Sequence, residues 1–138
     1  MIVVDTNVIS GACRMQPVAS ILAWLDGQAP GTLYISTMSL AEVLTGIAQM
    51  PAGRRREKLR EDTLRLLQEL FAGRILAFDE AAALAYSKMQ ALARKNGTPI
   101  GVADGIIAAT AISRGFAVAS GDVQPFKAAG LKVINPWE

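Results

Sequence analysis

The chain alternates short apolar runs with longer segments in which apolar residues recur every three or four positions. The apolar runs cover residues 2–4, 33–35, 75–77, 117–119 and 132–134. They are rich in Val, Ile and Leu, as are strands that are covered on both faces. The segments between them have the 3.6-residue period of amphipathic helices. This alternation predicts an α/β fold, with a parallel sheet flanked by helices on both faces.

The expected helices are separated by residues that usually end or begin helices. Helical periodicity covers residues 40–47, 59–71, 82–93 and 103–110, and a shorter stretch follows Pro17. Gly73 and Gly115 are suited to the ends of two of these helices, and Asp79 can cap the start of another. We find no internal repeat or linker, so the sequence predicts a single domain over residues 1–138.

Composition excludes several classes of protein. About half of the residues are hydrophobic (51%) and the mean hydropathy is +0.31, yet no apolar run approaches the roughly 18 residues of a membrane span. The N-terminus lacks the pattern of a signal peptide, so we expect a cytoplasmic protein without a membrane segment. The chain has no histidine, which excludes Ser-His and Cys-His catalysis. Its single cysteine, Cys13, is expected to be reduced and structural.

Four acidic residues stand at strand ends or inside apolar helical patterns: Asp5, Glu42, Asp104 and Asp122. A carboxylate is costly to withdraw from water unless a positive charge meets it. Ligands of parallel α/β sheets bind beyond the carboxyl ends of the strands, where the strand order reverses. Four oxygen donors without nitrogen or sulfur suit Mg²⁺ or Mn²⁺. The sequence therefore predicts a metal-binding catalytic site, provided that the fold brings these residues together.

Local alternatives exist for three of the acids. Asp5 can be the N-cap of the first helix, and Asp122 can serve as a cap or turn residue. Glu42 can close a capping box with Ser39, unless the helix starts earlier, at Ser36 or Thr37.

Asp104 is harder to assign to a local role. It is the one acid in the apolar segment 102–112, and the positive end of a helix that starts near Pro99 would stabilise its charge. Thr6 and Asn7 beside Asp5, and Ser120 beside Asp122, add polar groups that could support the site.

A basic segment lies in the middle of the chain: Arg54, Arg55, Arg56 and Lys58. Such a run is usually a solvated helix face, and Glu57, Glu61 and Asp62 can pair with several of its side chains. The functional alternative is contact with the phosphates of RNA.

Several motifs together resemble the PIN domain, and more closely the VapC-type toxins of the FitB-like group. The motifs are MIVVDTNVIS at 1–10, SLAE at 39–42, FAGRIL at 71–76, ADGIIAATA at 103–111, SGD at 120–122 and NPW at 135–137. Each motif is weak alone, but their order and spacing extend over essentially the whole chain.

The resemblance implies a five-stranded parallel sheet and a Mg²⁺- or Mn²⁺-dependent endoribonuclease that hydrolyses RNA through water activated by the metal. Asp5, Glu42, Asp104 and Asp122 match the acidic positions of the family. Thr6, Asn7 and Ser120 would be supporting polar groups. The resemblance also implies a cognate antitoxin, a homodimer, and contact with promoter DNA only through the antitoxin.

One position departs from the family pattern. Gly121 stands where a bulkier polar residue often precedes the fourth acid, which puts local substrate contacts in doubt. Two other functions remain open: a catalytically silent binding module, whose acids cap helices or receive a partner's arginine, and a metal-dependent nuclease that acts on DNA. The choice of RNA depends on the resemblance alone.

Overall fold

A five-stranded sheet lies at the centre of the computed structural model, which describes residues 1–138. The strands are β1 (Ile2–Val4), β2 (Leu33–Ser36), β3 (Ile75–Leu76), β4 (Ala117–Ala119) and β5 (Val133–Ile134). Their order is β3-β2-β1-β4-β5, and every neighbouring pair is parallel. The predicted five-stranded parallel sheet is confirmed.

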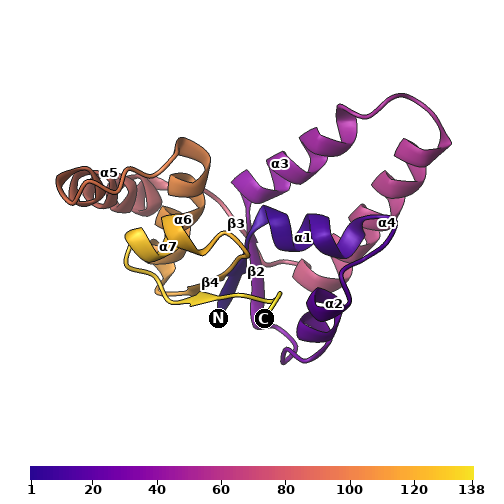
Figure 1. Ribbon diagram of the computed structural model, residues 1–138, viewed down its shortest axis with the longest axis horizontal. Coiled ribbons are helices and arrows are strands. Elements are labelled where there is room, and N and C mark those ends of the chain that lie inside the picture. Colours follow the sequence, from indigo (N-terminus) through magenta and orange to yellow (C-terminus); the bar gives the residue numbers. More distant parts are fainter.

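Seven helices surround this sheet. They are α1 (Thr6–Cys13), α2 (Ala19–Asp26), α3 (Thr37–Ala48), α4 (Arg54–Phe71), α5 (Glu80–Lys95), α6 (Val102–Arg114) and α7 (Val123–Ala128). Figure 1 shows α1 to α4 grouped on one side of the strands and α5 to α7 on the other. The longest of them, α4, is not apolar enough to cross a membrane, and neither is any other helix.

Adjacent residues of the central strand supply the two halves of the core. Val4 packs with residues of α1 to α4, whereas Val3 packs with Ile107 and Phe126 on the opposite face. Successive side chains of a strand point to opposite faces, so β1 serves both layers, and its Val3 and Val4 are fully buried. The helices on both faces therefore hold the carboxyl end of β1 firmly in place.

Most element boundaries agree with the predictions, and the differences have simple causes. β1 and β4 have the predicted bounds, β2 extends by one residue, and β3 and β5 are one residue shorter. α4 begins at Arg54, before its apolar stripe, because its first turn consists of charged residues. The predicted helices did not include α7, which contains Pro125, a residue more typical of turns. A proline in the first turn of a helix has no intrahelical N–H bond to lose.

Candidate functional site

The candidate site lies where the strand order reverses. β1 pairs with β2 on one side and with β4 on the other. After β1 the chain continues to β2 on one side of the sheet, whereas after β4 it continues to β5 on the opposite side. Asp5 directly follows β1, and Ser120 directly follows β4. The expectation that these two strands are neighbours is confirmed, and their polar ends meet at one edge.

Asp5 is almost fully buried (4% exposed) and has two roles at once. It is the N-cap of α1, and its Oδ1 accepts a hydrogen bond from the Thr6 N–H at 2.8 Å. Its Oδ2 accepts a hydrogen bond from the Ser120 hydroxyl at 2.7 Å. The N-cap alternative is correct, but it does not remove Asp5 from the site, because the second oxygen faces β4.

Glu42 reaches the same place from α3. The helix begins at Thr37 and is capped by Ser36, whose Oγ accepts a hydrogen bond from the Ser39 N–H at 3.0 Å. The capping box of Ser39 with Glu42 is therefore wrong, and the earlier helix start is right. Glu42 lies in the second turn, where its Oε1 accepts a hydrogen bond from the Thr6 hydroxyl at 2.7 Å.

Asp104 and Asp122 stand at the starts of two further helices. Asp104 lies in the first turn of α6, which begins at Val102, three residues after the expected Pro99. Asp122 precedes α7, but its side chain makes no capping bond, so a side-chain cap role for Asp122 is wrong. The negative charge of Asp104 is favoured by the amino end of its helix.

The three supporting polar residues form one network. The Asn7 amide donates a hydrogen bond to Ser120 Oγ at 3.2 Å, and its oxygen accepts one from the Gly121 N–H at 3.2 Å. Ser120 Oγ also accepts a bond from the Asp122 N–H at 3.0 Å. Asn7 and Ser120 thus join the loop after β4 to the start of α1, while Thr6 orients Glu42.

We call the four acids, Asp5, Glu42, Asp104 and Asp122, the acidic rim, and they interact electrostatically. Burial raises the pKa of Asp5 to about 6; hydrogen bonds from Ser120 and Thr6 oppose this rise, and the charges of Asp104 and Glu42 add to it. Burial also raises the pKa of Asp104, with further contributions from the charges of Asp122 and Glu42. No lysine or arginine forms an ion pair with any residue of the rim. The fold therefore concentrates negative charge at one edge without a protein cation to offset it.

This donor set fits a divalent cation, although the side chains as they stand do not form a ready cage. No three of the acidic and thiol side chains lie in an arrangement that could hold a metal ion. The rim nevertheless offers only carboxylate oxygens, which Mg²⁺ and Mn²⁺ prefer. A bound cation would offset the negative charge of the rim and lower the raised pKa of Asp5.

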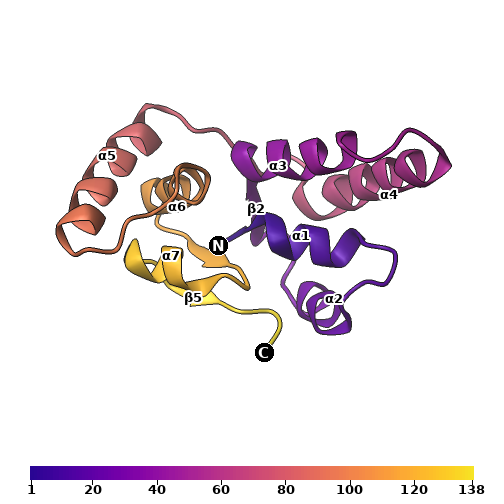
Figure 2. The same ribbon diagram turned by 45° about the horizontal axis from the view of Figure 1, so that its top comes forward.

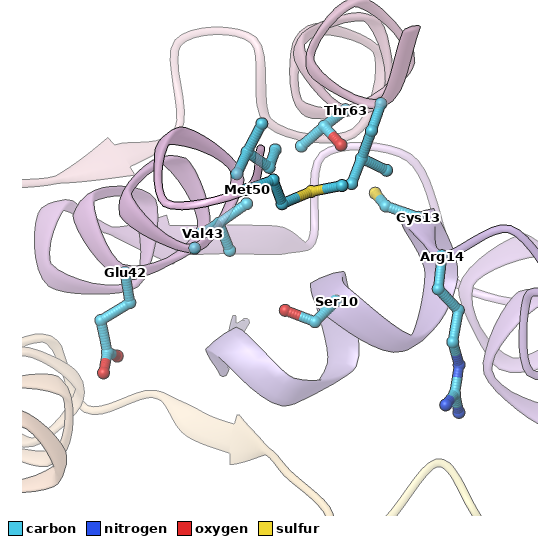
Figure 3. A pocket seen from close by; sticks show the side chains of 10 residues that line it. Ser10, Cys13, Arg14, Glu42, Val43, Met50 and Thr63 are labelled. Carbon is cyan, nitrogen blue, oxygen red and sulfur yellow. The ribbon is translucent and has the colours of Figure 1, made fainter. Parts of the chain in front are cut away.

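Two cavities adjoin the rim. One of about 240 Å³ lies between α1, α3 and α4, with Glu42, Ser10 and Arg14 along its length (Figure 3). The second, of about 440 Å³, is lined by Asn7, Gly121, Asp122, Asn135 and Trp137; we call it the tryptophan pocket. Sequence reasoning missed Ser10, Arg14 and Trp137 as residues near the site. The one available signal was Gly121, because Trp137 occupies the space that a side chain there would need.

The basic segment lies in the first five residues of α4, and none of its side chains pairs with the acidic rim. Lys58 pairs with Asp62 at 2.8 Å, and Arg56 pairs with Glu57 at 3.6 Å. Arg54 and Arg55 are exposed and form no ion pair. A cavity of about 860 Å³ is lined by Arg54, Arg55 and Lys58, and it shares Cys13, Arg14, Met50 and Leu59 with the cavity beside Glu42.

Comparison with known proteins agrees with this geometry. The family model of the PIN domain matches residues 2–131. A protein named VapC ribonuclease Y4jK, from Sinorhizobium fredii, is 48% identical over 138 residues, all of this chain and 99% of the relative. The solved structures of FitAcB from Neisseria gonorrhoeae and of FitAB bound to an IR36 DNA fragment each have a TM-score of 0.93 and 41% identity. They cover this whole chain, which corresponds to 99% and 96% of theirs.

The chain belongs to the PIN-domain family. The resemblance to the VapC and FitB group, stated from the motifs alone, is confirmed.

Proposed function

We propose that this chain is the toxin of a type II toxin–antitoxin pair and acts as a divalent-metal-dependent endoribonuclease. The observation that carries the proposal is the acidic rim of a PIN-domain chain, four carboxylates at the switch point with no basic partner. The relative named VapC ribonuclease supports the choice of RNA as the substrate.

In this proposal Asp5, Glu42, Asp104 and Asp122 hold Mg²⁺ or Mn²⁺. A divalent ion in such a site can polarise a phosphodiester and lower the pKa of water. The chain's own contribution is positioning. Ser120 fixes one oxygen of Asp5, and the Thr6 N–H fixes the other. The Thr6 hydroxyl orients Glu42. All three contacts are made by Thr6 and Ser120, which the sequence analysis named as supporting residues.

The basic segment would contact the RNA backbone, and its members are not equivalent. Arg54 and Arg55 are free to meet phosphates, whereas Arg56 and Lys58 are already paired with acids of their own helix. The cavities that connect Arg54 and Arg55 with Glu42 through Arg14 offer a path for a single strand. We therefore assign backbone contact chiefly to Arg54 and Arg55.

The proposed partners are a cognate antitoxin and a second copy of this chain. The solved structure of FitAB bound to a DNA fragment, and that of VapBC2 from Rickettsia felis bound to a DNA fragment from their promoter, support an antitoxin partner and contact with promoter DNA through it. For the homodimer, Leu84 (68% exposed) and Leu92 (57% exposed) of α5 provide apolar surface. Both belong to one helix and are two turns apart, so they lie on the same face.

The test is a cleavage assay with purified chain that has been freed of any partner. Single-stranded RNA should be cut with Mg²⁺ or Mn²⁺, and EDTA should stop the reaction. Asp5→Asn and Asp104→Asn should remove the activity, whereas Asp26→Asn, an exposed acid at the end of α2, should leave it unchanged. Equal cleavage of single-stranded DNA would replace the ribonuclease with a general nuclease. Undiminished cleavage by the two rim variants would refute the proposal.

A further inference from the structure

The tryptophan pocket is not used by the chemistry proposed above, although Asp122 belongs both to it and to the acidic rim. It has a volume of about 440 Å³, and three of its five lining residues, Asn7, Asp122 and Asn135, are polar. The segment after β5 returns past the sheet toward the side of α1 and α2 (Figure 2). This return brings Trp137 to the loop after β4, sixteen positions away from Gly121 in the sequence.

Local hydrogen bonds hold Trp137 in place. The backbone N–H of Trp137 donates to Asn135 Oδ1 at 3.1 Å, and the backbone N–H of Glu138 donates to the Asn135 carbonyl at 3.2 Å. Pro136 between them is buried. The aromatic ring covers Gly121 so closely that a Cβ there would come within 2.7 Å of it. The glycine is therefore what allows the ring to lie beside Asp122.

The ring is fixed and still accessible, because 37% of Trp137 remains exposed. The two amides of the pocket are already engaged. Asn7 bonds through its nitrogen to Ser120 Oγ and through its oxygen to the Gly121 N–H. Asn135 bonds through its oxygen to the Trp137 N–H and through its nitrogen to Glu138. The pocket thus offers an aromatic surface and few free groups that could read the edge of a ligand.

We propose that Trp137 is a stacking platform for one nucleobase of single-stranded RNA, next to the phosphate that the acidic rim receives. This inference rests on the proposed function, because the rim must bind a phosphate of the same strand. Bases stack readily on aromatic side chains, and the contact tolerates any base because each has a π-face. Trp137 is then a substrate-binding residue with little base selectivity, and Gly121 is the residue that positions it.

The chain contains two tryptophans, Trp24 and Trp137, so fluorescence can report on each separately. Trp24→Phe leaves Trp137 as the sole emitter, and Trp137→Phe leaves Trp24 on α2 as the matched control. Both are made with Asp104→Asn, so that the probe, a short oligoadenylate, remains uncut in Mg²⁺. We expect saturable quenching of Trp137 and none of Trp24. This measurement does not alter Trp137 in the reporting protein, so it does not depend on whether a Trp137 variant folds.

A kinetic experiment separates stacking from support of the fold. Trp137→Leu keeps apolar bulk over Gly121 but removes the π-face, and it should raise the KM for RNA about 5- to 150-fold with kcat nearly unchanged. Trp137→Phe should recover part of the loss. An oligonucleotide with one abasic position should bind the parent and Trp137→Leu equally well when the missing base is the stacked one.

The outcomes distinguish this inference from the proposed function. Cleavage of RNA without quenching of Trp137 would overturn the stacking platform and leave the ribonuclease intact. Quenching by oligoadenylate without any cleavage would support the platform while removing the proposed activity. Quenching by an arginine-containing peptide but not by oligoadenylate would overturn the inference in favour of a site for a protein partner.

Discussion

The acidic rim and the basic segment are both dense in like charge, but the fold treats them in opposite ways. The rim draws its residues from four separate elements and buries Asp5 without any basic neighbour. The basic segment lies at the largely exposed start of one helix, and two of its members pair with acids of the same helix. The acidic rim brings like charges together from distant parts of the chain at a cost to stability, and such an arrangement indicates a function. The basic segment is solvated and paired within its own helix, and such an arrangement is common without any function.

The largest test of this contrast is the removal of charge from the rim. Asp5→Asn or Asp104→Asn should lower kcat by more than about 100-fold, because even changes around a metal ligand cost 10- to 100-fold. The measurement is the single-turnover rate of RNA cleavage at saturating Mg²⁺. Arg56→Gln, in the basic segment, serves as the control and should change the rate less than threefold. Similar losses in the rim and the control would abolish the contrast.

The second test concerns stability. In the folded protein burial raises the pKa of Asp5 to about 6, above the ordinary value of 3.8 that applies when the chain is unfolded. Between these values the folded state binds more protons, so this group makes stability fall as pH rises from about 4 to 6. Without metal, Asp5→Asn should therefore be more stable at pH 7, by roughly 2–3 kcal/mol, and equal to the parent near pH 4.

Urea unfolding in EDTA at both pH values measures this difference. Asp26→Asn, on exposed surface, should shift the free energy of unfolding by less than about 0.5 kcal/mol. If Asp5→Asn is less stable than the parent at pH 7, the N-cap role of Asp5 outweighs the cost of its buried charge.

The third test addresses the network that organises the rim. Ser120→Ala removes the hydroxyl that donates to Asp5 and accepts from Asn7. Mn²⁺ affinity, measured by calorimetry, should fall about 10- to 100-fold, as is usual when the support of a metal ligand is lost. Ser113→Ala removes a hydroxyl that bonds only within α6 and should leave the affinity unchanged. Equal affinities of all three proteins would show that Asp5 needs no such support.

The smallest expected effect is in the basic segment. Arg54→Gln with Arg55→Gln should weaken RNA binding several-fold and lower the slope of log Kd against log salt by about 1.4, the value for two phosphate contacts on a single strand. Arg65→Gln, whose guanidinium already lies 3.6 Å from Asp62, is the control on the same helix. An unchanged slope in the double variant would show that the basic segment is a solvated surface that does not contact RNA phosphates.

Much of the site could be predicted because it depends on strand ends. Asp5 and Asp122 follow β1 and β4 directly or nearly so, and parallel strands place their carboxyl ends at one edge. The pairing of β1 with β4 had to be assumed, since the sequence does not give strand order. Trp137 could not be found in this way. Its contact with Gly121 depends on how the segment after β5 folds back, and no local pattern encodes that return.

The hydrogen-bond geometry of the acidic rim could not be predicted from the sequence either. Thr6 was expected to support the site, but the sequence did not indicate which carboxylate its hydroxyl would orient; the hydroxyl bonds to Glu42. Such a choice between two acceptors depends on distances of a few tenths of an ångström between α1 and α3, which residue patterns do not specify.

Ser120 and Asp5 are separated by 115 positions, and their hydrogen bond has a consequence for the time at which the protein matures. A ribosome makes β1 well before β4, the strand that completes its other side. A nascent chain therefore carries three of the four rim acids with no assembled edge to hold them. The acidic rim can therefore assemble only after β4 and the loop that follows it have been made.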